Sequence, residues 1–95
     1  MQLVFSQTAL FDLKQIHGYS AKTWSLRQAD TYYFELIDNC KNLLNFPKLG
    51  KPYNKLKLKP FGFKVAKHII FYKIEGQEIQ IIRIIHESMD LKKAI

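Results

Sequence analysis

The spacing of apolar residues changes at Pro47, and this change limits the folds open to the chain. Before Pro47, apolar residues recur every three or four positions over 7–20 and 25–45, which predicts two consecutive helices joined as a hairpin. Ser6 and Ser25 precede these stretches and are expected to cap the helices, because a serine hydroxyl accepts a hydrogen bond from a free N–H group of the first turn. After Pro47 the helical spacing is lost.

Short runs of β-branched and aromatic residues predict strands in the rest of the chain, at 2–5, 55–65, 68–74 and 78–86. Residues 55–59 alternate strictly between lysine and leucine, which predicts a half-exposed strand. The order β-α-α-β-β-β indicates an α+β fold, with the helical hairpin packed on one face of a mainly antiparallel four-stranded sheet. A chain of 95 residues is expected to form a single domain over 1–95, ending in a short helix or tail over 87–95.

The sequence predicts the environment of three residues in the helical half. Cys40 lies on the apolar stripe of the second helix and is expected to be a buried small hydrophobe. Trp24 stands at the junction of the two helices and is expected to pack between them. Asp12 is expected on the outer face of the first helix, beside other polar residues.

Positive charge is concentrated in the middle of the chain. The net charge is +7, and residues 39–74 contain nine lysines and no acidic residue, so the remaining six basic and eight acidic residues sum to −2. Such a segment attracts a polyanion or an acidic protein surface, or else is a solvated face that aids solubility. The predicted basic surface consists of Lys55, Lys57, Lys59, Lys64 and Lys67.

Several classes of site are not expected. One cysteine permits no internal disulfide, and His17, His68 and His86 are too far apart in sequence to suggest a metal site. We therefore expect neither a metal nor a cofactor. No apolar run approaches the ~18 residues of a membrane helix, and the N-terminus lacks the pattern of a signal peptide, so a cytoplasmic protein without a membrane partner is expected.

Arg83 and His86 interrupt the aliphatic strand at 78–86. Ionisable residues are disfavoured where both faces of a strand are buried, so the pair marks either a face turned toward a partner or a site. If the last two strands form a hairpin, His68 and His86 lie at the same end of the sheet, where the alternative role for each is a structural hydrogen bond to the backbone. A metal-independent ribonuclease would need a cation and a titratable group, for which the candidates are Lys59, Lys64, Arg83 and His86.

Six short motifs occur in a fixed order along the chain. They are Ala9-x-x-Asp12-Leu13-x-x-Ile16-x-x-Tyr19; Trp24-Ser25-x-x-Gln28-Ala29-x-x-Tyr32; Pro47-x-x-Gly50-Lys51; His68-Ile69-Ile70-Phe71-Tyr72-Lys73; Ile82-Arg83-Ile84-Ile85-His86; and Met89-Asp90. Together they resemble the ParE branch of the RelE/ParE toxin superfamily over nearly the whole chain. One departure is the region 58–64, which lacks the arginine that the family places before the H-x-I-F-Y run. Lys59 or Lys64 is its counterpart.

The resemblance implies the toxin of a type II toxin–antitoxin pair, neutralised by a ParD-like antitoxin. It also implies inhibition of DNA gyrase, through its A subunit, by binding rather than by catalysis, with no direct sequence-specific binding of nucleic acid. The target-binding residues would be Arg83, His86, Met89 and Asp90. The alternative is a RelE-like endoribonuclease that cleaves mRNA on the ribosome.

Overall fold

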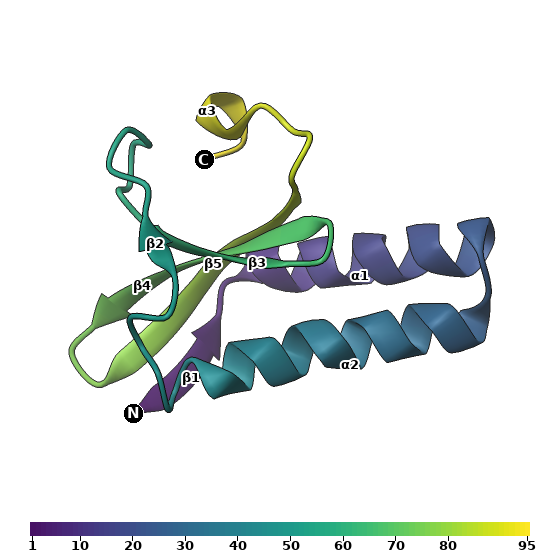
Figure 1. Ribbon diagram of the computed structural model, residues 1–95, viewed down its shortest axis with the longest axis horizontal. Helices are drawn as coiled ribbons and strands as arrows, with labels where there is room; N and C mark the ends of the chain where they lie inside the picture. The colour runs from purple at the N-terminus through teal and green to yellow at the C-terminus, as the bar shows by residue number, and fades with distance from the viewer.

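Five strands form one mixed sheet in the computed structural model, which describes residues 1–95 (Figure 1). The elements in chain order are β1 (Gln2–Phe5), α1 (Gln7–Thr23), α2 (Leu26–Asn42), β2 (Lys51–Pro52), β3 (Phe61–Val65), β4 (His68–Glu75), β5 (Glu78–His86) and α3 (Leu91–Ala94). The strand order is β1-β5-β4-β3-β2; β1 runs parallel to β5, and the other pairs are antiparallel. The predicted α+β class is confirmed, and the sheet has one strand more than predicted.

The two long helices begin where their serine caps place them. The hydroxyl of Ser6 accepts a hydrogen bond from the N–H of Ala9 at 2.9 Å, and the hydroxyl of Ser25 accepts one from the N–H of Gln28 at 3.1 Å. Both caps follow the prediction. The helix ends differ slightly from it, since α1 continues to residue 23 and α2 ends at residue 42.

The strand predicted at 55–59 is wrong, because this segment forms a compact turn. The turn is held by hydrogen bonds from the N–H of Leu56 to the C=O of Tyr53 and from the N–H of Lys59 to the C=O of Leu56. Lys59 has a φ of 49°, which no strand residue adopts. Only Leu56 is buried, whereas Leu58 is 45% exposed, so the alternating leucines do not share a buried face. Pairing in the sheet begins later, at Phe61.

Both faces of the sheet are covered. The helices α1 and α2 enclose the main core with one face of the sheet, and the buried Cys40 belongs to this core as predicted. A second cluster of Leu56, Ile69, Phe71 and Ile85 lies on the opposite face, where α3 and the turn at 53–60 pack against it. Figure 1 shows α3 and the helical hairpin on opposite sides of the sheet. None of the helices combines the length and apolar composition that crossing a membrane requires.

Candidate partner-binding groove

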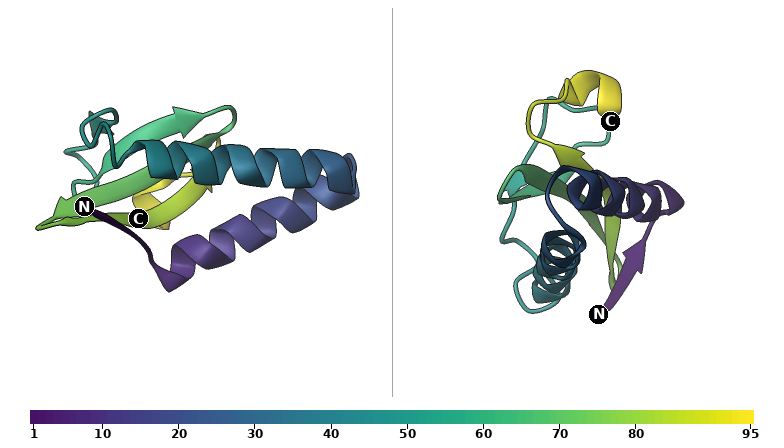
Figure 2. Two further views of the ribbon diagram at one scale, coloured as in Figure 1. Left: turned by 90° about the horizontal axis from the view of Figure 1, so that it is seen from below. Right: turned by 90° about the vertical axis from the view of Figure 1, so that its right-hand side faces the viewer.

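A groove of about 940 Å³ lies between the far half of the helical hairpin and the end of the sheet. It forms because the hairpin extends beyond the strands, as Figure 2 shows from below, so that the inner side of its tip is not packed on the sheet. Three large side chains on its wall are well exposed: Tyr19 at 66%, Trp24 at 65% and Met89 at 49%. The predicted packing of Trp24 between the helices is therefore wrong. Trp24 instead meets Tyr19 edge-on at the hairpin tip, with ring centroids 6.3 Å apart.

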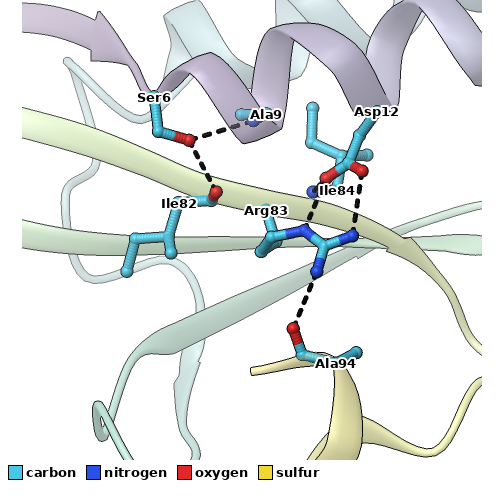
Figure 3. A network of polar contacts seen from close by, with 7 residues as sticks. All are labelled: Ser6, Ala9, Asp12, Ile82, Arg83, Ile84 and Ala94. Atoms are coloured by element: carbon cyan, nitrogen blue, oxygen red, sulfur yellow. Dashed lines mark hydrogen bonds and ion pairs between the residues drawn. The ribbon is translucent and has the colours of Figure 1, made fainter.

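The floor of the groove is fixed by a carboxylate on the first helix (Figure 3). β1 ends at Phe5, so the second half of β5 has no strand neighbour on that side. Polar groups of α1 and its cap replace that neighbour: the hydroxyl of Ser6 donates to the C=O of Ile82 at 2.7 Å, and the carboxylate of Asp12 accepts from the N–H of Ile84 at 3.0 Å. Asp12 is 8% exposed and faces β5, so its expected place on the outer face of the helix is wrong.

Asp12 also holds Arg83 in a two-pronged ion pair. The Nε and Nη2 atoms of Arg83 donate to the two carboxylate oxygens at 2.9 and 3.0 Å, and Nη1 donates to the C=O of Ala94 at 2.7 Å. The hydrogen bond to Asp12 raises the pKa of Arg83 above its ordinary value. Arg83 thus connects α1 to α3 across the edge of β5 (Figure 3). Its N–H groups are used in contacts that stabilise the fold.

A bulge in β5 gives Arg83 this direction. Phe71 pairs with Arg83 and the next residue, Tyr72, pairs with Ile81, so Ile82 is the extra residue. A bulge reverses the face to which the following residues point. Ile79 and Ile81 before the bulge and Ile84 after it reach the main core, while Ile85 reaches the second cluster. Without the bulge, the arginine would point into the main core, where an unpaired charge would be costly.

His68 and His86 face each other at the end of β4 and β5, as the predicted hairpin required. They are directly paired in the sheet, and their ring centroids are 5.3 Å apart. Nδ1 of His68 lies 2.6 Å from the phenol oxygen of Tyr32, whose hydroxyl is also within 3.1 Å of the C=O of Val65. The pKa of His68 is lowered to about 4, mainly by burial and to a smaller extent by the neighbouring His86. His68 is therefore neutral at pH 7.

His86 and the residues after it form the outer rim of the groove. Nδ1 of His86 accepts a hydrogen bond from the N–H of Ser88 at 3.1 Å, which places the ring proton of the neutral imidazole on Nε2. His86 and Met89 both line the groove. Asp90 does not line it, because its carboxylate caps α3 by accepting a hydrogen bond from the N–H of Lys92 at 3.1 Å. Of the four predicted target-binding residues, two are exposed at the groove and two have structural partners.

The lysines of the predicted basic surface fall into two groups. Lys64 lies 2.8 Å and Lys67 3.9 Å from carboxylate oxygens of Glu87, and the hydrogen bond from Lys64 lowers the pKa of that carboxyl group. The other three, Lys55, Lys57 and Lys59, lie on the turn at 53–60, which packs into the same apolar cluster as α3. The four predicted ribonuclease residues are not brought together: Arg83 and His86 line the groove, whereas Lys59 and Lys64 do not.

The sequence interpretation missed Asp12, Tyr32 and the low pKa of His68 as features of this site. One signal for Asp12 was available, since an arginine in an aliphatic strand needs a buried acidic partner. Asp12 is the one acidic residue of the first predicted helix. No three His, Cys, Asp or Glu side chains converge in a geometry that could hold a metal ion.

The comparisons with known proteins agree with this architecture. The family described as "ParE toxin of type II toxin-antitoxin system, parDE" matches residues 3–91. The chain is 31% identical to Toxin ParE1 of Caulobacter vibrioides over 92% of this chain and 90% of that protein. It is 23% identical to Toxin ParE1 of Mycobacterium tuberculosis, strain CDC 1551 / Oshkosh, over 95% and 93% respectively.

A solved structure shares the fold. It is a chain of the "Chromosomal ParDE TA system from P. aeruginosa", with a TM-score of 0.80 and 19% identity over 90% of this chain and 95% of that one. The similarity to the family therefore extends over nearly the full length of the chain in both sequence and fold. The chain belongs to the ParE toxin family of type II toxin–antitoxin systems.

Proposed function

We propose that this ParE-like toxin acts by binding DNA gyrase and that a cognate ParD-like antitoxin neutralises it by occupying the groove. The observation that carries the proposal is that the charged and the exposed apolar residues around β5 have different roles. Arg83 of β5 is bonded to Asp12 and Ala94, while the exposed groove residues Tyr19, Trp24 and Met89 are of the kind that dominates protein interfaces. Action on gyrase would take place in the cytoplasm.

The groove suits a partner segment with apolar side chains and acidic neighbours. Its apolar lining includes Ile16 and Ile84, and its rim carries Met89 and Lys67, whose side chain is 75% exposed. An acidic residue of the antitoxin would compete with Glu87 for this lysine and for Lys64. Such rim contacts mainly accelerate association and weaken with salt. A segment in the groove would also cover His86 and Met89, so the antitoxin and gyrase would exclude each other.

A ribonuclease is the weaker candidate because its cation is occupied. Stabilising a developing phosphate charge requires preorganised donors that point at the reacting atoms. Nε and Nη2 of Arg83 point at Asp12 instead, and Lys64 is engaged by Glu87. His86 offers only its Nε2–H to the solvent when neutral, since Nδ1 accepts from Ser88. This arrangement supports binding rather than catalysis.

The decisive experiment measures gyrase supercoiling and ribosome-dependent mRNA cleavage side by side with the purified toxin. We expect inhibition of supercoiling that added antitoxin reverses. The His86→Ala variant should weaken inhibition by ~5–10-fold, the value of one contact outside a hot spot. A general acid or base would instead contribute ~10²–10⁴-fold to a cleavage rate.

A matched aromatic pair tests the groove. Trp24→Ala should weaken antitoxin or gyrase binding by at least ~30-fold, as hot-spot tryptophans do. Phe46→Ala removes a similarly exposed ring, at 59%, that does not line the groove, and should leave binding unchanged. Equal effects of the two changes would argue against the groove. A toxin that leaves supercoiling unaffected at large excess but cuts mRNA on the ribosome would refute the gyrase proposal.

A further inference from the structure

Two basic segments that are far apart in sequence lie on the same face of the sheet. The turn at 53–60 and helix α3 both pack into the cluster of Leu56 and Phe71, on the side opposite the helical hairpin (Figure 1). Their exposed lysines form what we call the second-face lysines: Lys55, Lys57, Lys59, Lys92 and Lys93. The sequence alone did not predict that Lys92 and Lys93 share a face with the lysine-rich middle of the chain.

The second-face lysines have no acidic partners. None of them takes part in an ion pair, whereas Lys64, Lys67 and Arg83 each pair with a carboxylate. Asp90, the acidic residue nearest in sequence to Lys92 and Lys93, uses its carboxylate to cap α3. Unpaired like charges on one surface repel each other and reduce stability, and a bound polyanion removes that repulsion.

Hydrogen bonds and buried side chains hold the backbone that carries these lysines. In the turn, the N–H of Tyr53 donates to the C=O of Pro60 at 2.8 Å, and Leu56 and Pro60 are buried. In α3, the C=O of Ala94 accepts a hydrogen bond from Arg83. The positive charges are therefore displayed on two anchored segments.

We propose that the second-face lysines bind the phosphate backbone of duplex DNA without sequence preference. Lysine is a point charge suited to phosphate contacts, and no arginine is present on these segments to read base edges. Single-stranded nucleic acid would need exposed rings for stacking, but Tyr53 packs edge-on against Phe71 with ring centroids 5.0 Å apart. Protein interfaces are depleted in lysine at their cores, which makes an acidic protein the poorer fit.

The biological role of this DNA-binding site rests on the proposed function, because gyrase is itself bound to duplex DNA when it acts. The groove lies at the end of the sheet, and none of the second-face lysines lines it. A toxin bound to gyrase through the groove would keep the second face free for the DNA. The DNA contact would then lengthen the lifetime of the toxin on the enzyme–DNA complex.

The test measures binding of a fluorescently labelled short duplex to the full-length toxin by anisotropy, without gyrase, between ~50 and ~200 mM salt. The variant carries Lys55→Gln, Lys57→Gln and Lys92→Gln. The control carries Lys14→Gln, Lys22→Gln and Lys41→Gln, which remove the same charge from α1 and α2. Lys59 is left intact because of its positive φ.

We expect the slope of log affinity against log salt to fall by ~3 in the variant, at ~0.9 per lost phosphate contact, and to change little in the control. Circular dichroism verifies that both remain folded. Equal losses in the two would show a net-charge effect and overturn the proposal. So would binding of polyglutamate as tight as that of DNA and equally sensitive to the variant, which would indicate an acidic protein. Since gyrase is absent, failure here leaves the gyrase proposal standing, and failure of gyrase inhibition leaves this result unaffected.

Discussion

The ion pair between Asp12 and Arg83 gives the sharpest prediction about stability. Its side chains are 9% and 24% exposed, and the carboxylate accepts three hydrogen bonds, two from the guanidinium and one from the N–H of Ile84. The perturbation is a double-mutant cycle of Asp12→Leu and Arg83→Met, which replace each charged group by an apolar group of similar shape.

The expected magnitudes follow from what each change leaves behind. Asp12→Leu leaves the half-buried Arg83 without its carboxylate and the N–H of Ile84 without an acceptor, and Arg83→Met leaves a buried carboxylate with one donor. Breaking a buried pair from either side costs ~3–5 kcal/mol. The double variant has no unpaired charge, but the N–H of Ile84 and the C=O of Ala94 lose these partners, so it should lose ~1–3 kcal/mol. The two single effects should therefore not add, and the coupling should exceed ~2 kcal/mol.

The assay is urea unfolding followed by circular dichroism at the helix band, because the single tryptophan is exposed and reports folding poorly. With a slope of ~1–3 kcal/mol per molar urea, a loss of ~3–5 kcal/mol should shift the midpoint of each single variant by ~1–5 M. Asp30→Asn is the control, since Asp30 is 56% exposed at its side chain and pairs with His17 on the surface. It should lose under ~1 kcal/mol. Additive effects of Asp12→Leu and Arg83→Met would refute the reasoning.

Other substitutions should alter stability in different directions. Gly18→Ala should stabilise the protein by ~0.5–1 kcal/mol, because the added methyl group meets open space within a helix. Gly62→Ala should destabilise it by ~1–3 kcal/mol, because the ring of Tyr53 occupies the position of the added methyl group. Thermal melts that rank the two variants in the opposite order would contradict this. Tyr72→Phe should lose ~1–3 kcal/mol in urea unfolding, since the phenol satisfies two backbone groups within 47–50, and an unchanged midpoint would count against it. For His68 the folded pKa is about 4 against an ordinary 6.5, so its neutral form contributes stability that is complete above pH 6.5 and is lost as the pH falls toward 4. Solvent screening of the half-buried ring limits the loss to ~1–2 kcal/mol, and His68→Gln should flatten this part of the stability curve.

The sequence predicted those parts of the fold that depend on neighbouring residues. Serine caps act within one turn, and so Ser6 and Ser25 located both helix starts correctly. The continuous apolar run of β4 was recognisable because the strand is buried on both faces. The alternation at 55–59 misled because it is also compatible with a turn that buries one leucine against a distant cluster. Only the tertiary partner distinguishes the two.

The groove was less predictable for the same reason. Helical spacing puts Asp12 among polar residues. Its carboxylate nevertheless points inward, because the end of β5 has no strand neighbour there and the N–H of Ile84 needs an acceptor. The bulge at Ile82 leaves no local signal and decides where Arg83 points. The polar pair in the last strand was therefore correctly singled out, but only His86 of that pair remains exposed for a partner.

Residues of different motifs form hydrogen bonds with one another. Asp12 of the first motif holds Arg83 of the fifth, and Tyr32 of the second lies against His68 of the fourth; likewise, the hydroxyl of Tyr72 donates to the C=O of Pro47 and accepts from the N–H of Gly50.

These contacts join segments that local signals cannot align, so the motifs largely encode the fold. Three large apolar side chains of the motifs differ, because Tyr19, Trp24 and Met89 remain about half exposed or more while lining one groove. Exposed aromatic and thioether groups contribute little to the stability of a lone chain, but they contribute strongly to binding when a partner removes them from water. The same sequence pattern that specifies the fold thus leaves a small apolar set for recognition, and changes at Trp24 or Met89 should separate binding from stability more cleanly than changes at Arg83.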